Sequence, residues 1–104
     1  MHDGQAVVTT PEEVDISNAG LLREALVSAT VSGQPVIVVD MSATEFCDST
    51  GLNVLVRALG LAEQAGAELR LVMGGTGLRR VLTVTGVAGM FRTYETLGQA
   101  LEAA

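Results

Sequence analysis

Four apolar runs stand out along the chain. The central run, residues 36–41, is rich in β-branched side chains and shows no alternation, which is typical of a strand buried on both faces of a sheet. Further runs at residues 6–10, 68–73 and 91–94 predict three more strands.

Between these runs, apolar residues recur every three or four positions, as they do in helices that pack on a core. The longest such segment covers residues 51–65, where the only polar line is Asn53, Arg57 and Gln64. We therefore expect a largely buried helix with one narrow polar edge. Its apolar stripe comprises Leu52, Leu55, Val56, Leu59 and Ala62, widened by Val54, Ala58, Leu61 and Ala65.

Three other helices are expected from their start and stop signals. Ser17 or Asn18 caps the first, and Gly33 with Pro35 ends it. A glycine-rich turn at residues 74–77 opens a short helix, and a terminal helix follows from Leu97.

Strands that alternate with helices predict an α/β domain with crossover helices. The expected architecture is a four- to five-stranded, mostly parallel (mixed) sheet with about four helices. At 104 residues the chain is interpreted as one domain, residues 1–104, with a flexible polar start at residues 1–5.

Charge narrows the range of partners. The net charge is −6, with six arginines and no lysine, which disfavours nucleic acid and anionic membrane as partners because both require a basic surface. A basic protein surface is a better match. The absence of lysine excludes Schiff-base chemistry, a phosphate-loop lysine and the lysine of phospho-aspartate receiver domains.

The single cysteine and single histidine narrow the chemistry further. Cys47 has no second cysteine with which to form a disulfide. No signal segment and no apolar run of membrane-spanning length is recognisable, so a cytoplasmic location is predicted. His2, near the terminus, lacks a second metal-binding neighbour, so no metal site is predicted. Catalysis is not expected, because neither Cys47 nor Ser49 has a usable histidine base.

Residues 44–51 lie between the central strand and the longest helix. Asp48 or Ser49 is expected to cap that helix. Cys47 is interpreted as a small, half-buried hydrophobic residue below this loop, with a redox role as a lesser hypothesis, since oxidation there would place a polar group beside Ser49.

Two other segments invite functional interpretations. Residues 74–77 are rich in glycine, but no phosphate-loop pattern is present, so a plain strand-to-helix turn is preferred to a nucleotide site. Asp40 ends the central strand and is expected to bind backbone N–H groups of the following turn rather than a metal ion or a phosphoryl group.

The run at 36–41, followed by Phe46-Cys47-Asp48-Ser49-Thr50-Gly51-Leu52, resembles the signature of STAS domains, specifically of single-domain anti-sigma factor antagonists. That signature is an apolar strand ending in Asp-Leu or Asp-Met, then Phe-x-Asp-Ser-Ser/Thr-Gly-Leu at the start of a helix. Residues 69–72, Leu82-x-x-x-Gly86-Val87 and Leu97-x-x-Ala100-Leu101 match later parts of the family, so the resemblance covers nearly the whole chain.

The resemblance implies a regulatory switch without a cofactor. In that family the unmodified domain binds an anti-sigma factor that has serine kinase activity, which frees a sigma factor, and the kinase phosphorylates the serine after the motif aspartate. The matching residue is Ser49, in a chain expected to be a monomer or weak dimer. The motif and partner-binding residues expected to surround it are Asp15, Asn18, Asp48, Thr50, Gly51 and Asn53.

The chemistry of a helix start is compatible with this role. A phosphate adds about −1.5 to −2 charges, which the N-terminal end of a helix tolerates, so the fold should survive while the docking surface changes. An alternative is a constitutive STAS subunit of a stressosome or lipid-transport assembly in which Ser49 only caps the helix. A nucleotide sensor that uses residues 74–77 is a third hypothesis.

Overall fold

The computed structural model describes residues 4–103. Its main sheet has four strands in the order β1-β3-β5-β6, and every pairing in it is parallel. The strands are β1 (Gln5–Thr9), β3 (Val36–Asp40), β5 (Glu68–Val72) and β6 (Arg92–Tyr94). The predicted α/β architecture is confirmed, and within the described residues its mostly parallel sheet is entirely parallel.

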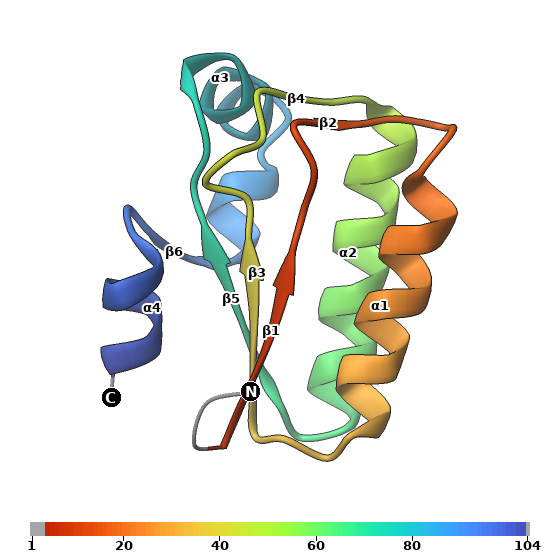
Figure 1. Cartoon of the computed structure of the whole chain (residues 1–104), viewed down its shortest axis with the longest axis vertical. Coiled ribbons are helices and arrows are strands. Elements are labelled where there is room, and N and C mark those ends of the chain that lie inside the picture. The colour runs from red at the N-terminus through yellow and green to blue at the C-terminus, as the bar shows by residue number, and fades with distance from the viewer. Residues whose placement is uncertain (1–3, 104) are drawn as a thin grey trace.

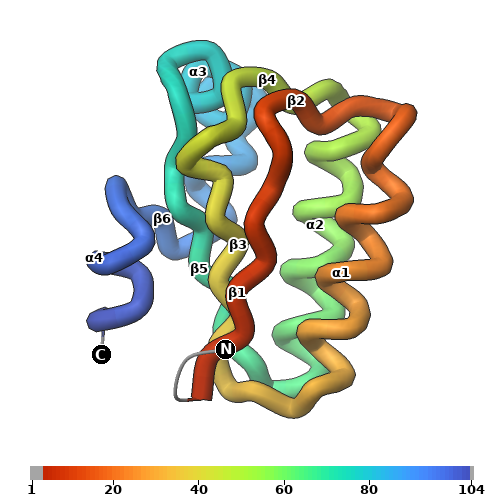
Figure 2. The backbone as a smooth tube through the Cα atoms, in the orientation of Figure 1, coloured from red at the N-terminus to blue at the C-terminus, as the bar shows by residue number. Residues whose placement is uncertain are grey.

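The helices lie on both faces of this sheet (Figure 1). Two long helices pack side by side on one face, and the short C-terminal helix covers the other face (Figure 2). The helical elements are α1 (Ala19–Val31), α2 (Ser49–Gln64), α3 (Thr76–Val84), the 3-10 helix η1 (Val87–Met90) and α4 (Leu97–Glu102). Gly33 and Gly66 follow α1 and α2 at φ values of 80° and 76°, a conformation that favours glycine.

A second, two-stranded sheet was not predicted. β2 (Glu13–Val14) pairs in parallel with β4 (Phe46–Cys47), with Val14 opposite Cys47. A strand of two residues is too short to show a period-2 pattern, which explains why the sequence indicated only loops here. This pair connects the segment before α1 to the segment before α2.

Two expectations about exposure were wrong. Gln5 was assigned to a flexible start, yet it begins β1, and its side-chain amide donates a hydrogen bond to the Leu101 carbonyl at 2.7 Å. Residues 1–3, including His2, lie outside the described residues. Helix α2 is also less buried than its stripe predicted: Leu61 is 43% exposed and Ala65 is exposed, because only α1 and the sheet cover the helix.

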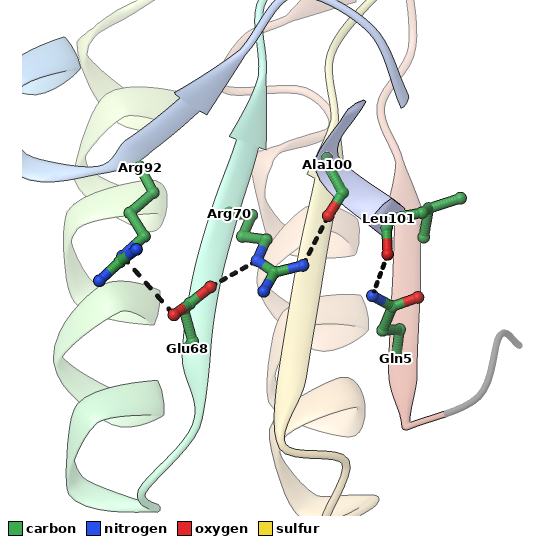
Figure 3. A network of polar contacts seen from close by, with 6 residues as sticks. All are labelled: Gln5, Glu68, Arg70, Arg92, Ala100 and Leu101. Carbon is green, nitrogen blue, oxygen red and sulfur yellow. Dashed lines mark hydrogen bonds and ion pairs between the residues drawn. The ribbon is translucent and has the colours of Figure 1, made fainter. Parts of the chain in front are cut away.

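The core has a part on each face of the sheet. The larger part lies between the sheet and the two long helices, and the smaller part lies under α4. Arg70 is buried below α4, pairs with Glu68 and donates a hydrogen bond to the Ala100 carbonyl at 2.6 Å (Figure 3). Together with Gln5, it satisfies carbonyl groups at the end of α4 that have no partner within the helix.

Candidate functional site

Asp48 caps helix α2. Its side chain accepts a hydrogen bond from the backbone N–H of Gly51 at 3.0 Å, and its carbonyl accepts one from Leu52 at 2.9 Å. The sequence left the cap open between Asp48 and Ser49, and the structure assigns it to Asp48. Such a cap satisfies one of the four N–H groups that a helix start leaves without a partner.

Ser49 is therefore not needed as the cap. It is the first residue of α2 and is exposed, and its hydroxyl makes no hydrogen bond with residues 4–103. A hydroxyl at a helix start, near unsatisfied N–H groups, is accessible to a modifying enzyme and lies where negative charge is tolerated.

Gly51 allows the first turn of α2 to lie directly on the small sheet. A Cβ atom at this position would lie 2.6 Å from the sulfur of Cys47 and 2.7 Å from a methyl group of Val14. Val14 and Cys47 are both buried, so neither has free space into which to move. Thr50 lies half-buried beside this contact, and Asn53 is exposed one turn further along the helix.

The start of α1 is built differently. Asn18 occupies the cap position, but its side chain does not cap the helix, nor does that of Ser17. The Asn18 side chain instead accepts a hydrogen bond from the Asp15 N–H at 2.9 Å and donates one to the Glu13 carbonyl at 2.8 Å. The expectation of a side-chain cap was wrong here, because the preceding loop uses the groups that a cap would need.

Asp15 is held as a carboxylate by its own loop. The Ser17 hydroxyl and the Ser17 backbone N–H donate hydrogen bonds to it and lower its pKa, with a smaller contribution from the backbone of Asn18. A negative charge therefore remains on this loop at neutral pH.

The small sheet brings both helix starts to one end of the molecule (Figure 1). The Asp48 N–H donates a hydrogen bond to the Val14 carbonyl at 3.0 Å, and the Glu45 N–H donates one to the Glu12 carbonyl at 2.7 Å. We call this end the motif face and define it by Asp15, Ile16, Asn18, Phe46, Asp48, Ser49, Thr50 and Asn53. It contains the motif and partner-binding residues expected from two distant segments of the sequence, except Gly51, which is buried.

Two members of the motif face were not predicted as surface residues. Ile16 is 79% exposed and Phe46 is 46% exposed, although both are large and apolar. Large apolar residues are also exposed elsewhere, among them Leu21, Val31 and Val84, so Ile16 and Phe46 are distinguished by their place beside the motif residues rather than by their exposure. The isolated position of Ile16 between Asp15 and Ser17 was the available signal.

Comparison with known families and structures agrees with this geometry. A family model described as the STAS domain matches residues 1–100. The chain belongs to the STAS family. This STAS domain is 32% identical over 102 residues to the anti-sigma-F factor antagonist RsfB of Mycobacterium tuberculosis, a match that covers 96% of this chain and 81% of RsfB.

Two solved structures share both fold and sequence with the STAS domain. An anti-sigma factor antagonist from Mycobacterium paratuberculosis is 34% identical with a TM-score of 0.84, covering 99% of this chain and 87% of that one. The putative anti-sigma factor antagonist TM1081 from Thermotoga maritima is 26% identical with a TM-score of 0.87, covering 98% and 88%.

Below the STAS motif, Cys47 is fully buried rather than half-buried, at 1% exposure. Burial, and then the negative charge of Asp48, raise the pKa of the thiol to about 11. Since the thiolate is the reactive form, the native site opposes oxidation at neutral pH. The hypothesis of a redox role consequently requires this end of the domain to open first.

The glycine-rich turn of the STAS domain has a structural explanation. The Gly75 N–H donates a hydrogen bond to the Thr44 carbonyl at 3.2 Å, and a Cβ atom at Gly74 would lie 2.3 Å from that same oxygen. The Glu45 carboxylate lies against Gly75, because a Cβ atom there would meet it at 2.3 Å. That charge opposes phosphate binding, which supports the interpretation as a plain turn.

The remaining sequence hypotheses for the STAS chain concern metal ions and membranes. The Asp40 carboxylate accepts a hydrogen bond from the Ser42 N–H at 3.0 Å, as expected for a turn-binding role. Residues 4–103 contain no group of three side chains able to hold a metal ion. None of the helices in that range is both long enough and apolar enough to span a bilayer.

Proposed function

We propose that this STAS domain is an anti-sigma factor antagonist that phosphorylation of Ser49 switches off. The observation that carries the proposal is that Asp48, and not Ser49, caps α2. The exposed Ser49 hydroxyl has no hydrogen-bond partner within residues 4–103. Relatives at 32% and 34% identity are named as anti-sigma factor antagonists, which supports the regulatory role.

The unmodified motif face is proposed to bind an anti-sigma factor that has serine kinase activity. Ile16 and Phe46 supply exposed apolar area, while Asp15 and Asp48 supply charge beside them. Burying apolar area gives affinity, and charges around it select the partner.

Phosphorylation would change this face without unfolding the domain. The phosphate adds about −1.5 to −2 charges beside the carboxylate of Asp48 and close to the apolar contacts, where desolvation of a dianion is unfavourable. The same phosphate lies at the N-terminal end of a helix, where the helix dipole stabilises it. The expected result is loss of binding with the fold retained.

The test uses the purified domain, ATP and candidate kinases with an anti-sigma role. We expect phosphate on Ser49 by mass spectrometry, Ser49→Ala to bind the kinase without being modified, and Ser49→Asp to bind at least about tenfold more weakly, as one tenfold step corresponds to about 1.4 kcal/mol. Gln64→Glu is the matched control, because it adds one negative charge at the exposed far end of the same helix.

Equal binding by Ser49→Ala and Ser49→Asp would reject the switch and favour the constitutive subunit. An equal loss of binding in Gln64→Glu would reject a local effect at Ser49.

A further inference from the structure

A groove runs between the outer sides of α1 and α2, on the face of the helix pair turned away from the sheet. It has a volume of about 180 Å³. Its floor is apolar, and Val27 and Leu61 remain 38% and 43% exposed within it. The lining residues are Arg23, Leu26, Val27, Val54, Arg57, Ala58 and Leu61.

The two arginines of the groove are not engaged elsewhere in the described structure. The ion pairs among residues 4–103 involve Arg70, Arg79 and Arg92. The positions three and four residues from Arg23 and Arg57 along their own helices carry no acidic residue. Both side chains are exposed, so their charges are available to a ligand.

This combination contrasts with the overall charge. The chain has a net charge of −6, and two of its six arginines line a single apolar groove. Five of its twelve acidic residues, Glu12, Glu13, Asp15, Glu45 and Asp48, lie at the motif face or in the loops beside it, and no acidic residue lines the groove. The groove therefore carries local positive charge that complements an acidic ligand. A second hollow, on α3, is also lined by two arginines, but Arg79 there is paired with Glu95.

The dimensions favour a helix over a small molecule. A volume of about 180 Å³ lies below the roughly 300–1,000 Å³ of pockets that enclose drug-sized ligands. The α2 side of the groove presents Val54, Ala58 and Leu61 at helical spacing, and a second amphipathic helix can lay its apolar ridge along such a surface.

We propose that this groove binds an acidic amphipathic helix of a partner protein. Apolar side chains of that helix would lie on Val27, Val54 and Leu61, and its carboxylates would pair with Arg23 and Arg57. The groove shares no lining residue with the motif face, so the proposal does not depend on the antagonist function.

The probe is a fluorescent 18-residue helical peptide with leucine at i, i+3, i+4 and i+7 spacing and flanking glutamates. Its match carries lysine at every glutamate position. Fluorescence anisotropy with the full chain is expected to show that the glutamate peptide binds at least about tenfold more tightly than the lysine peptide, a difference of about 1.4 kcal/mol. Higher salt should weaken the tighter complex.

Variants locate the interaction. The Arg23→Ala/Arg57→Ala double variant should weaken binding of the glutamate peptide at least about tenfold. Arg80→Ala removes one charge from the exposed surface of α3, outside the groove, and should leave binding unchanged. Arg57→Glu should weaken binding of the glutamate peptide and strengthen binding of the lysine peptide.

Three results would overturn the proposal. The first is equal binding of the two peptides, or no binding of the glutamate peptide up to about 1 mM, the weak end of specific affinities. The second is an Arg80→Ala effect as large as that of the Arg23→Ala/Arg57→Ala double variant. The third is arginine-dependent sedimentation with phosphatidylglycerol vesicles in the absence of peptide binding, which would assign the groove to a lipid surface.

Discussion

The starts of α1 and α2 lie together at one end of the molecule but are stabilised in different ways. The start of α2 combines a side-chain cap from Asp48 with a buried contact in which Gly51 lies on Val14 and Cys47. The start of α1 relies on hydrogen bonds among Asp15, Ser17 and Asn18 that are exposed or only partly buried. Buried close packing leaves little room to relax, whereas exposed polar bonds compete with water. Ser49, the proposed switch residue, therefore lies on a closely packed support, and the start of α1 beside it is held mainly by polar bonds.

The largest expected effect comes from breaking the buried contact. Gly51→Ala should destabilise the domain by about 2–3 kcal/mol, because the new methyl group overlaps Cys47 and Val14 in a packed region. Urea unfolding followed by circular dichroism measures this change. Gly60→Ala on the same helix meets nothing within 4 Å and should instead stabilise by about 0.5–1 kcal/mol, since alanine favours the helix. A Gly51→Ala protein as stable as the parent chain would show that the contact is not tight.

An intermediate effect on stability is expected when the polar side chains at the two helix starts, Asp48 and Asn18, are removed in separate variants. Asp48→Ala should cost about 1 kcal/mol, the usual value of an N-cap. Asn18→Ala should cost less, about 0.5 kcal/mol, because the hydrogen bond from its side chain to the Glu13 carbonyl is exposed and water can replace it. Denaturant unfolding measures the free energy of unfolding of each variant. Hydrogen exchange at the backbone amides of Asp15 and Gly51 shows which helix start has lost its protection. A larger cost for Asn18→Ala would reverse the comparison.

The smallest effect on stability is expected at Ser49, the proposed switch residue. Ser49→Asp should change the free energy of unfolding by no more than about 0.5 kcal/mol, and in the stabilising direction, because an acid in the first helical turn interacts favourably with the dipole. Thermal unfolding at neutral pH and at low salt provides the measurement. A loss of more than about 1 kcal/mol, beyond the range of such surface charges, would mean that phosphorylation acts by unfolding rather than by charge.

The amino-acid sequence was sufficient to predict the main sheet and the position of α2. The β-branched run at residues 36–41 and the helical period after it are strong local signals, and together they place Ser49 at a helix start. The family signature added the proposed role of that serine, which the capping chemistry by itself left open.

Local sequence patterns could not predict the contacts between distant segments. β2 and β4 have two residues each, so their pairing depends on tertiary structure, and it is this pairing that brings Asp15 and Asn18 to the motif face. The exposure of Leu61 and Phe46 likewise depends on which neighbours cover them. The apolar stripe of α2 predicted burial of a wide arc of the helix surface, but α1 and the sheet cover only part of that arc.

The single thiol of this chain is an intrinsic probe of how often the motif face opens. Cys47 belongs to the small sheet and is buried against the first turn of α2, and the chain has no other thiol that could react. A thiol reagent such as a chromogenic aromatic disulfide will therefore label Cys47 only when the motif face opens. The labelling rate then reports the frequency or the free energy of opening, depending on whether closing is slow or fast. Following this rate with and without phosphate on Ser49 would reveal whether modification changes the opening of the support as well as the charge on its surface.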